Sequence, residues 1–165
     1  MKPETIQETT SLWESEPEKA QGKPSVTARS EGSQAVVEHG SFSWRVDLPP
    51  PLGGTNDAPS PTALLLSALA GCAVVFIRDT LAPQLGIRVD GIEAHAQCDA
   101  DARGLLGIGG AVPDLRNFQL TFQVESPEPE AQVRKLYDTW LERCPIYLAL
   151  IKQVDVATSF EVKGS

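Results

Sequence analysis

The sequence predicts an α+β fold in which antiparallel strands surround one long, buried central helix. Three segments, 42–48, 115–125 and 154–162, alternate apolar and polar residues with the period of two that is typical of half-buried strands. The stretch from Ser60 to Leu81 is apolar on almost every side, as a helix is when it is buried in a domain centre or an interface. Strands and helices come in blocks rather than in strict alternation, which argues against a doubly wound parallel sheet.

Length and charge narrow the class of protein. A chain of 165 residues suits one domain with a real core. The net charge of −8 argues against binding to a phosphate backbone and gives no reason to expect attraction to anionic lipid. The longest apolar run, 63–77, is shorter than the roughly 20 residues that span a bilayer. Three cysteines without a secretion signal favour reduced thiols, so we expect a cytoplasmic protein with no membrane and no nucleic-acid partner.

The first 24 residues differ in composition from the rest of the chain. Residues 1–24 are rich in Glu, Thr, Ser and Lys, which favours a polar and mostly disordered tail. Ile6, Leu12 and Trp13 leave a second interpretation open, in which an apolar stripe of a short arm docks on a partner subunit. We expect residues 25–165 to form the single folded domain.

The domain is expected to begin with three short strands, at roughly 25–29, 34–39 and 42–48. The last two are joined by a turn around Gly40. A loop rich in Pro and Gly over 49–61 ends the third strand, because proline removes a donor from the strand ladder.

The central helix has a clear start and stop. Ser60 is a good N-cap, and Pro61 suits the first helical position. We expect the helix to end at about Leu81, before Pro83 and Gly86.

The second half of the chain adds strands and two further helices. Long strands are expected at 87–100 and 115–125, joined by a Gly-rich connection that lacks the GxxxxGK[ST] pattern of a phosphate-binding loop. A second helix is expected from the N-cap candidate Ser126 to Cys144, with apolar residues at helical spacing. Pro145 ends that helix, and a short third helix and the last strand close the chain.

Several kinds of chemistry are disfavoured by the residues present. His39 and His95 have no close His or Cys partner with metal-ligand spacing, so we expect no bound metal. The GxSxG turn of a serine hydrolase is absent from the sequence. Cys98 shares its strand face with Ala94 and Ala96, which is typical of simple packing.

Cys72 and Cys144 are the two thiols whose surroundings bear on reactivity. Cys144 precedes Pro145 and is expected at the N-cap of the third helix, where backbone N–H groups and the positive helix end lower the pKa of a thiol. Cys72 follows Gly71, which permits a close approach, but its apolar neighbours raise its pKa and favour an inert core thiol. The residues alone leave both interpretations of Cys72 open.

The stretch GGTNDAPSPTALLLSALAGC, together with ERCPIYLAL farther along, resembles the OsmC/Ohr family of osmotically inducible and organic hydroperoxide resistance proteins. The shared features are a Gly-Gly loop, a proline at the helix start, a cysteine after small residues in an apolar helix, and a second cysteine before proline. The resemblance covers roughly residues 25–163 and is closer to the OsmC-like subgroup than to the hydroperoxide resistance enzymes.

The resemblance implies an intertwined homodimer with buried central helices and two active sites at the subunit interface. It also implies cysteine-based peroxidase chemistry without a cofactor. Cys72 would attack an organic hydroperoxide, Cys144 would condense with the resulting sulfenic acid, and a cellular dithiol would reduce the disulfide.

The sequence departs from the family pattern at the start of the central helix. Peroxidase members resemble NPEQL there, and their glutamate holds an arginine against the reactive sulfur. Pro61, Thr62 and Ala63 occupy these positions here, so the glutamate is missing. Arg29 is the best match for the family arginine and Arg45 a weaker one, with an ordinary surface arginine as the alternative for both.

Our hypothesis from sequence is a thiol peroxidase that reduces organic hydroperoxides in oxidative-stress defence, with Cys72, Cys144 and Arg29 as its catalytic candidates. The alternative is a non-catalytic dimer that binds a small apolar molecule, or that senses redox state through a Cys72–Cys144 disulfide.

Overall fold

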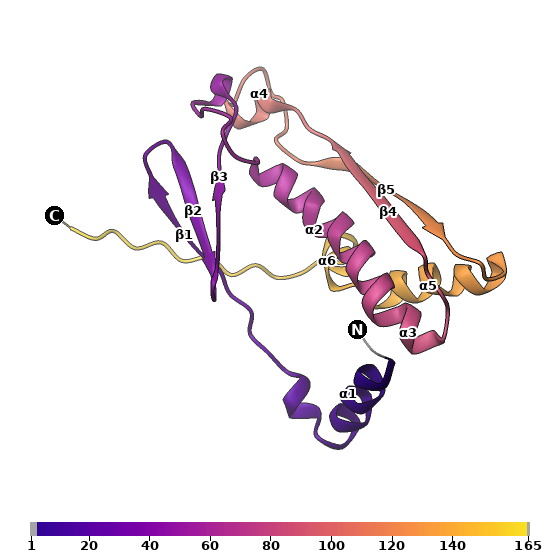
Figure 1. Ribbon diagram of the computed structural model, residues 1–165. Coiled ribbons are helices and arrows are strands. Elements are labelled where there is room, and N and C mark those ends of the chain that lie inside the picture. Colours follow the sequence, from indigo (N-terminus) through magenta and orange to yellow (C-terminus); the bar gives the residue numbers. More distant parts are fainter. Residues whose placement is uncertain (1–2, 165) are drawn as a thin grey trace.

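The computed structural model describes residues 3–164 and combines two antiparallel sheets with a long helix between them (Figure 1). The first sheet has the order β1-β2-β3 and the second consists of β4 and β5. The strands are β1 (Thr27–Glu31), β2 (Gln34–His39), β3 (Phe42–Val46), β4 (Gly91–Asp99) and β5 (Arg116–Glu125). The α+β class and all five of these antiparallel strands are confirmed, with boundaries that shift by a few residues.

The central helix is continuous from Pro61 to Leu85 but changes its winding once. It consists of α2 (Pro61–Phe76), the π-helical turn η3 (Ile77–Leu81) and α3 (Ala82–Leu85). Ser60 Oγ accepts the Ala63 N–H at 3.2 Å, which confirms the predicted N-cap.

The helix continues one turn beyond the predicted end. The Ala82 N–H donates to the Ile77 carbonyl, the wider spacing of a π turn. This wide turn lets Pro83, which has no N–H to donate, sit in the first turn of α3. Gly86 then ends the helix with a φ of 65°, in the left-handed region that glycine tolerates.

One face of the central helix forms the middle of the core. Leu69, Ala73, Ile77 and Leu81 are buried there. They pack with Leu136 and Trp140 of α5 (Glu130–Arg143) and with Cys144 before α6 (Pro145–Ile151). By length and composition the Pro61–Leu85 helix is apolar enough to cross a membrane, a test that the core helix of a soluble domain also passes.

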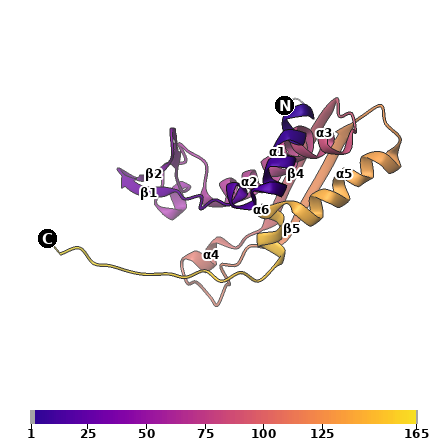
Figure 2. The same ribbon diagram turned by 90° about the horizontal axis from the view of Figure 1, so that it is seen from below.

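The N-terminal residues are helical, so the expectation of a mostly disordered tail is wrong for residues 3–20. The structure has α1 (Pro3–Ser15) followed by the 3-10 turn η1 (Pro17–Ala20). α1 lies beside α3 of its own chain, as both views show (Figures 1 and 2). The placement of the domain boundary near residue 24 remains a prediction.

The second helix starts later than its sequence indicates. Ser126 was the predicted N-cap, but α5 begins at Glu130 with Pro129 before it. The Ser126 hydroxyl instead donates to the Arg88 carbonyl at 2.5 Å and accepts the Glu128 N–H at 3.1 Å. The side chain therefore ties the loop to the entry of β4 and is not available to cap the helix.

The connection between β4 and β5 contains a short helix that the sequence did not predict. This helix is α4 (Ala102–Leu105), and its N-cap Asp101 accepts the Arg103 N–H at 3.1 Å. Gly107, Gly109 and Gly110 follow with positive φ angles. The connection thus joins two antiparallel strands and does not lead from a strand into a long helix, as a phosphate-binding loop does.

The strand expected at 154–162 is wrong for the single chain. These residues are extended and unpaired within the described residues 3–164, and the segment leaves the body of the molecule (Figure 1). Its apolar side chains are exposed, Phe160 to 90%. The alternating pattern is real, but a strand forms only where another strand offers its backbone groups, and none lies alongside here.

Candidate functional site: two facing thiols

The structure brings Cys72 and Cys144 together. Cys72 lies in the third quarter of α2, and Cys144 lies between α5 and α6. Their sulfur atoms are 3.0 Å apart, and both thiols are free. A disulfide bond is about 2.05 Å long, so the two sulfurs need to approach by only about 1 Å to form one.

The position of Cys144 follows from the helix break at Pro145. The Cys144 N–H still donates to the Trp140 carbonyl at 2.9 Å, so it closes the last turn of α5. Its carbonyl accepts the Leu148 N–H at 2.9 Å, and its sulfur accepts the Tyr147 N–H at 3.5 Å. Cys144 is thus the N-cap of α6, as predicted, and its side chain is completely buried.

Cys72 is the more exposed thiol of the pair and the one whose acidity is suppressed. Burial raises the pKa of the Cys72 thiol to about 12, with smaller upward contributions from its hydrogen bond to Cys144 and from the charge of that neighbour. The Ile146 backbone acts in the opposite direction. Among the described residues, none of the groups that set this pKa is a cation.

Arg29 does not reach Cys72 within one chain. It lies on β1, where its Nη1 atom pairs with Glu38 Oε2 at 2.6 Å. It shares a cavity of about 450 Å³ with Gly54 and Pro61 at the start of α2. Cys72 follows Pro61 by eleven residues, which is about 16 Å along a helix axis and beyond the reach of an arginine side chain.

The weaker arginine candidate is also occupied elsewhere. Arg45 on β3 pairs with Glu31 on β1 at 2.5 Å and donates to Gln34 at 3.1 Å. Thr62 and Ala63, which stand where the family has its glutamate, lie in the first turn of α2 at the same end of the helix as Arg29. The structure therefore separates the two parts of the predicted site: thiols near the middle of the central helix, and Arg29 near its start.

Asp47 is a structural residue that the sequence analysis missed. Alternation along the predicted strand 42–48 puts it on the polar face, yet only 3% of the Asp47 surface is exposed. Its carboxylate accepts hydrogen bonds from Leu48 N and Thr55 Oγ1, each at 2.7 Å, and from Asp57 N at 3.0 Å. These bonds, the Thr55 hydroxyl first, hold the pKa of Asp47 well below its ordinary value.

Asp47 fixes the Gly-Gly loop that leads into α2. A Cβ atom on Gly54 would lie 1.9 Å from the Leu48 carbonyl oxygen, so only glycine fits beside this strand. The available signal was an acidic residue at a strand end, six to ten residues before the members of a Gly-Gly-Thr-Asn-Asp turn that is rich in potential donors.

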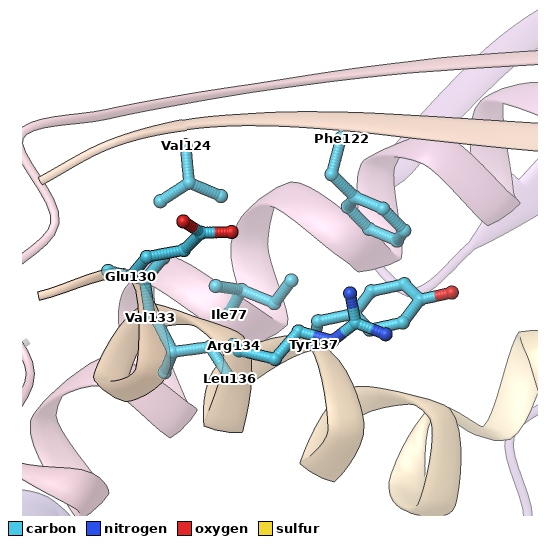
Figure 3. A pocket seen from close by; sticks show the side chains of 8 residues that line it. All are labelled: Ile77, Phe122, Val124, Glu130, Val133, Arg134, Leu136 and Tyr137. Carbon is cyan, nitrogen blue, oxygen red and sulfur yellow. The ribbon is translucent and has the colours of Figure 1, made fainter.

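The cavity drawn in Figure 3 is separate from the thiols. It has a volume of about 440 Å³ and lies between β5 and α5, with Ile77 and Phe122 on its apolar side and Glu130 and Arg134 as its charged side chains (Figure 3). No cysteine is among the described residues that line it. Arg134 is engaged already, since it lies 4.9 Å from the centre of the Tyr137 ring and pairs with Asp138 at 3.3 Å.

A smaller cavity lies between α2, β5 and the helices α5 and α6. It has a volume of about 280 Å³ and is lined by Leu69, Trp140 and Tyr147 among others. The Trp140 and Tyr147 rings are 5.1 Å apart, and the buried Trp140 Nε1 atom has no hydrogen-bond partner within residues 3–164. Across the same residues, no three His, Cys, Asp or Glu side chains gather as metal ligands.

Comparison with known proteins places this arrangement in a family. The family model described as "OsmC-like protein" matches residues 54–159. No curated protein matches the chain. Similar solved structures include an OsmC-like protein from Mycoplasma pneumoniae, with a TM-score of 0.66, 24% identity, and coverage of 79% of this chain and 88% of that one.

Two further similar structures carry names that refer to hydroperoxides. One is an organic hydroperoxide resistance protein OsmC from Legionella pneumophila, with a TM-score of 0.54, 21% identity, and coverage of 81% and 93%. The other is the organic hydroperoxide resistance protein OhrB of Bacillus subtilis, with a TM-score of 0.51, 19% identity, and coverage of 81% and 94%. These identities establish a shared fold, and the family match spans more than half of the sequence. The chain therefore belongs to the OsmC/Ohr family of OsmC-like proteins.

Proposed function

We propose that this protein is a thiol peroxidase that reduces organic hydroperoxides as a homodimer in the cytoplasm. The observation that carries the proposal is the 3.0 Å separation between the sulfurs of Cys72 and Cys144 in a chain of this family. A two-cysteine peroxidase needs one thiol that can meet the substrate and a second thiol beside it that resolves the sulfenic acid. The partly buried Cys72 and the buried Cys144 fit these two roles.

The proposed reaction has three balanced steps. The Cys72 thiolate attacks the distal oxygen of the hydroperoxide, the O–O bond breaks, and the alkoxide takes a proton and leaves as an alcohol. The Cys144 sulfur then attacks the Cys72 sulfenic acid, which forms the disulfide and releases water. A cellular dithiol supplies two electrons and two protons, so it becomes a disulfide while both cysteines return to thiols.

The reaction requires a cation that one chain does not deliver to Cys72. Burial raises the pKa of the Cys72 thiol to about 12, so the thiol is protonated at pH 7 in the single chain. A positive charge near the sulfur would favour the thiolate and lower this pKa. We assign that role to Arg29 of a second copy, because Arg29 of the same chain lies at the far end of α2.

The surface of the single chain supports a second copy. α2 exposes Ser67, Ala68, Gly71 and Val75 on one side, and the first three of these residues are small enough to permit the close approach of another helix. Cys72 follows Gly71 directly, so a second copy packed on this side of α2 would lie close to the thiols. The extended segment 154–162 has alternating apolar side chains that a strand of a second copy would cover.

Peroxide consumption by purified protein tests the chemistry. With cumene hydroperoxide and dithiothreitol, we expect the unaltered protein to consume peroxide and Cys72→Ser to be inactive. Cys144→Ser should form a sulfenic acid on Cys72 that dimedone traps, without catalytic turnover. Cys98→Ser is the matched control and should behave like the unaltered protein. If Cys72→Ser consumes peroxide as fast as the unaltered protein, the proposal is wrong.

Mixing two inactive variants tests whether the site is shared between copies. Cys72→Ser and Arg29→Ala are each expected to be inactive. In a mixed dimer, Arg29 of the first variant meets Cys72 of the second, so one of its two sites is intact. Random mixing should then restore about a quarter of the unaltered activity. If both residues acted within one chain, the mixture would stay inactive.

A second function remains a candidate because of the same raised pKa. A thiol that is protonated at neutral pH suits a slow redox sensor, in which a Cys72–Cys144 disulfide changes the state of a non-catalytic dimer. Such a protein would form the disulfide so slowly that, with excess dithiol, it would consume peroxide no faster than Cys72→Ser. The peroxide assay separates the two functions directly.

A further inference from the structure

The N-terminal helix builds a cavity that the rest of the fold does not provide. The family match begins at residue 54, so α1 lies outside it. We propose that α1 forms one wall of a binding site for the organic group of the substrate, and that this helix selects neutral aryl or alkyl hydroperoxides. The inference rests on the proposed peroxidase function and names the substrate class for its site.

The cavity lies between α1 and the second half of the central helix. Its volume is about 620 Å³, within the range of about 300–1,000 Å³ typical of small-molecule sites. Ile6 and Trp13 line it from α1, and Phe76, Thr80 and Gln84 line it from α2, η3 and α3. Phe76 and Thr80 are half-buried, so the floor is already partly shielded from water.

This cavity begins one helical turn from the Cys72 sulfur. Phe76 follows Cys72 by four residues, so the two side chains lie on one face of α2, about 6 Å apart along the axis. Thr80 and Gln84 continue away from the thiol in further steps of four. A hydroperoxide whose oxygen reaches Cys72 would therefore direct its organic group over Phe76 and under α1.

The other cavities fit this role less well. Ile77 in the cavity of Figure 3 lies five residues after Cys72, which is about 140° around the helix and away from the thiol face. Leu69 lies near that face, but its cavity is enclosed by β5, α5 and α6 around the buried Trp140. A ligand held there would depend on Trp140 and not on Trp13.

The charges around the cavity indicate the class of ligand. Glu14 is the one charged side chain among the described residues that line it. The hydroxyls of Thr9 and Thr10 donate to the carbonyls of Thr5 and Ile6 within α1, at 2.7 and 2.8 Å, so they are not free to donate to a ligand. An anionic organic group would meet a like charge and find no cation, whereas a neutral one would bury its surface against Trp13 and Phe76.

The full-length protein with Trp13→Ala tests the site. Leu12→Ala is the matched control, because Leu12 is a similarly exposed apolar neighbour on α1 that does not line the cavity. We expect Trp13→Ala to lower kcat/KM for cumene hydroperoxide about tenfold and to change that for tert-butyl hydroperoxide less than twofold. Thr10→Trp, which fills the cavity from its exposed side, should produce the same selective loss, and Leu12→Ala should change neither value.

A binding measurement without turnover separates this inference from the proposed reaction. The probe is 2-phenyl-2-propanol, the alcohol formed from cumene hydroperoxide, titrated into Cys72→Ser protein by NMR. Adding Trp13→Ala should weaken its binding about tenfold. If the alcohol binds in a manner that depends on Trp13 but the unaltered protein has no peroxidase activity, the binding site is supported and the proposed reaction is wrong. The site would be overturned if the protein is an active peroxidase but neither Trp13→Ala nor Thr10→Trp changes its alcohol binding or its kinetics with cumene hydroperoxide. An equal loss in Leu12→Ala would also overturn it, because general docking of α1 and not the cavity would then be responsible.

Discussion

The two sheets of the molecule differ in how much of their apolar surface one chain covers. In the β4–β5 sheet, Ala96 and Phe122 pack against the core around α2 and α5. In the β1–β3 sheet, Phe42 is 70% exposed and Trp44 is 36% exposed, and the sheet stands apart from the helical body (Figures 1 and 2). Both sheets carry strands with the same alternating pattern. A period of two therefore shows which side chains form the apolar face of a strand, but not whether the same chain buries that face.

The largest loss of stability should come from a substitution in the core that covers the β4–β5 sheet. Trp140 is buried, and its ring lies 5.0 Å from Phe122 and 5.1 Å from Tyr147. Trp140→Ala should lower the free energy of unfolding by about 3–5 kcal/mol, because it leaves a large cavity. Trp44→Ala is the matched change in the open sheet and should cost much less at concentrations where both proteins are monomeric. Urea unfolding at several protein concentrations measures both values, and equal losses would contradict the comparison.

A second prediction concerns the uncovered side of α2. Val75 is 50% exposed in the single chain. If a second copy covers it, Val75→Glu places an unpaired charge in an apolar interface and should weaken dimerisation at least a hundredfold. Val112→Glu is the control, since Val112 is 46% exposed in the β4–β5 connection. Analytical ultracentrifugation of both variants gives the dissociation constants; a dimer that survives Val75→Glu unchanged would mean that this side of α2 stays open.

A third, pH-dependent effect is expected where the open sheet meets the central helix. Folding lowers the pKa of Asp47, so its contribution to stability is complete above the unfolded pKa of about 4 and is lost as pH falls through the folded value. Asp47→Asn should therefore lower the melting temperature at pH 7, and the gap to the unaltered protein should narrow below about pH 4. Thermal melts between pH 2 and 7 measure this gap. Asp114→Asn, at an exposed position, is the control, and a gap that does not change with pH would contradict the role of the carboxylate.

Local signals predicted much of the fold and one half of the candidate site. The Ser60 cap, Pro61 and the Cys144 N-cap follow from single residues whose backbone preferences dominate their surroundings. The π turn before Pro83 and the use of Ser126 by the Arg88 carbonyl depend on tertiary contacts, so no local pattern encodes them. The predictions were therefore correct where a residue determines the backbone of its own helical turn, and wrong or missing where contacts between distant segments decide.

The candidate site shows the same division. The 3.0 Å approach of Cys72 and Cys144 joins residues 72 positions apart; the residues singled out both thiols, and the family resemblance implied that they pair. Arg29 was nominated by the same resemblance, yet the single chain leaves it at the other end of α2. The buried Asp47 was missed because alternation places a side chain on a face but does not reveal the loop that folds over it. What the sequence could not supply is the distance between segments that are far apart along the chain.

The smallest effect should come from the ion pair that ties together the outer strands of the open sheet. Arg45 on β3 pairs with Glu31 on β1, and both side chains are about half-exposed in one chain. Glu31→Gln should lower the free energy of unfolding by at most about 1 kcal/mol, because exposed pairs gain little and salt screens them. Urea unfolding of the dilute monomer in 0.05 and 1 M salt measures this loss, which should vanish at the higher concentration. A loss above about 2 kcal/mol that appears only at dimer-forming concentrations would mean that a second copy covers this pair, and would place the open sheet inside the interface.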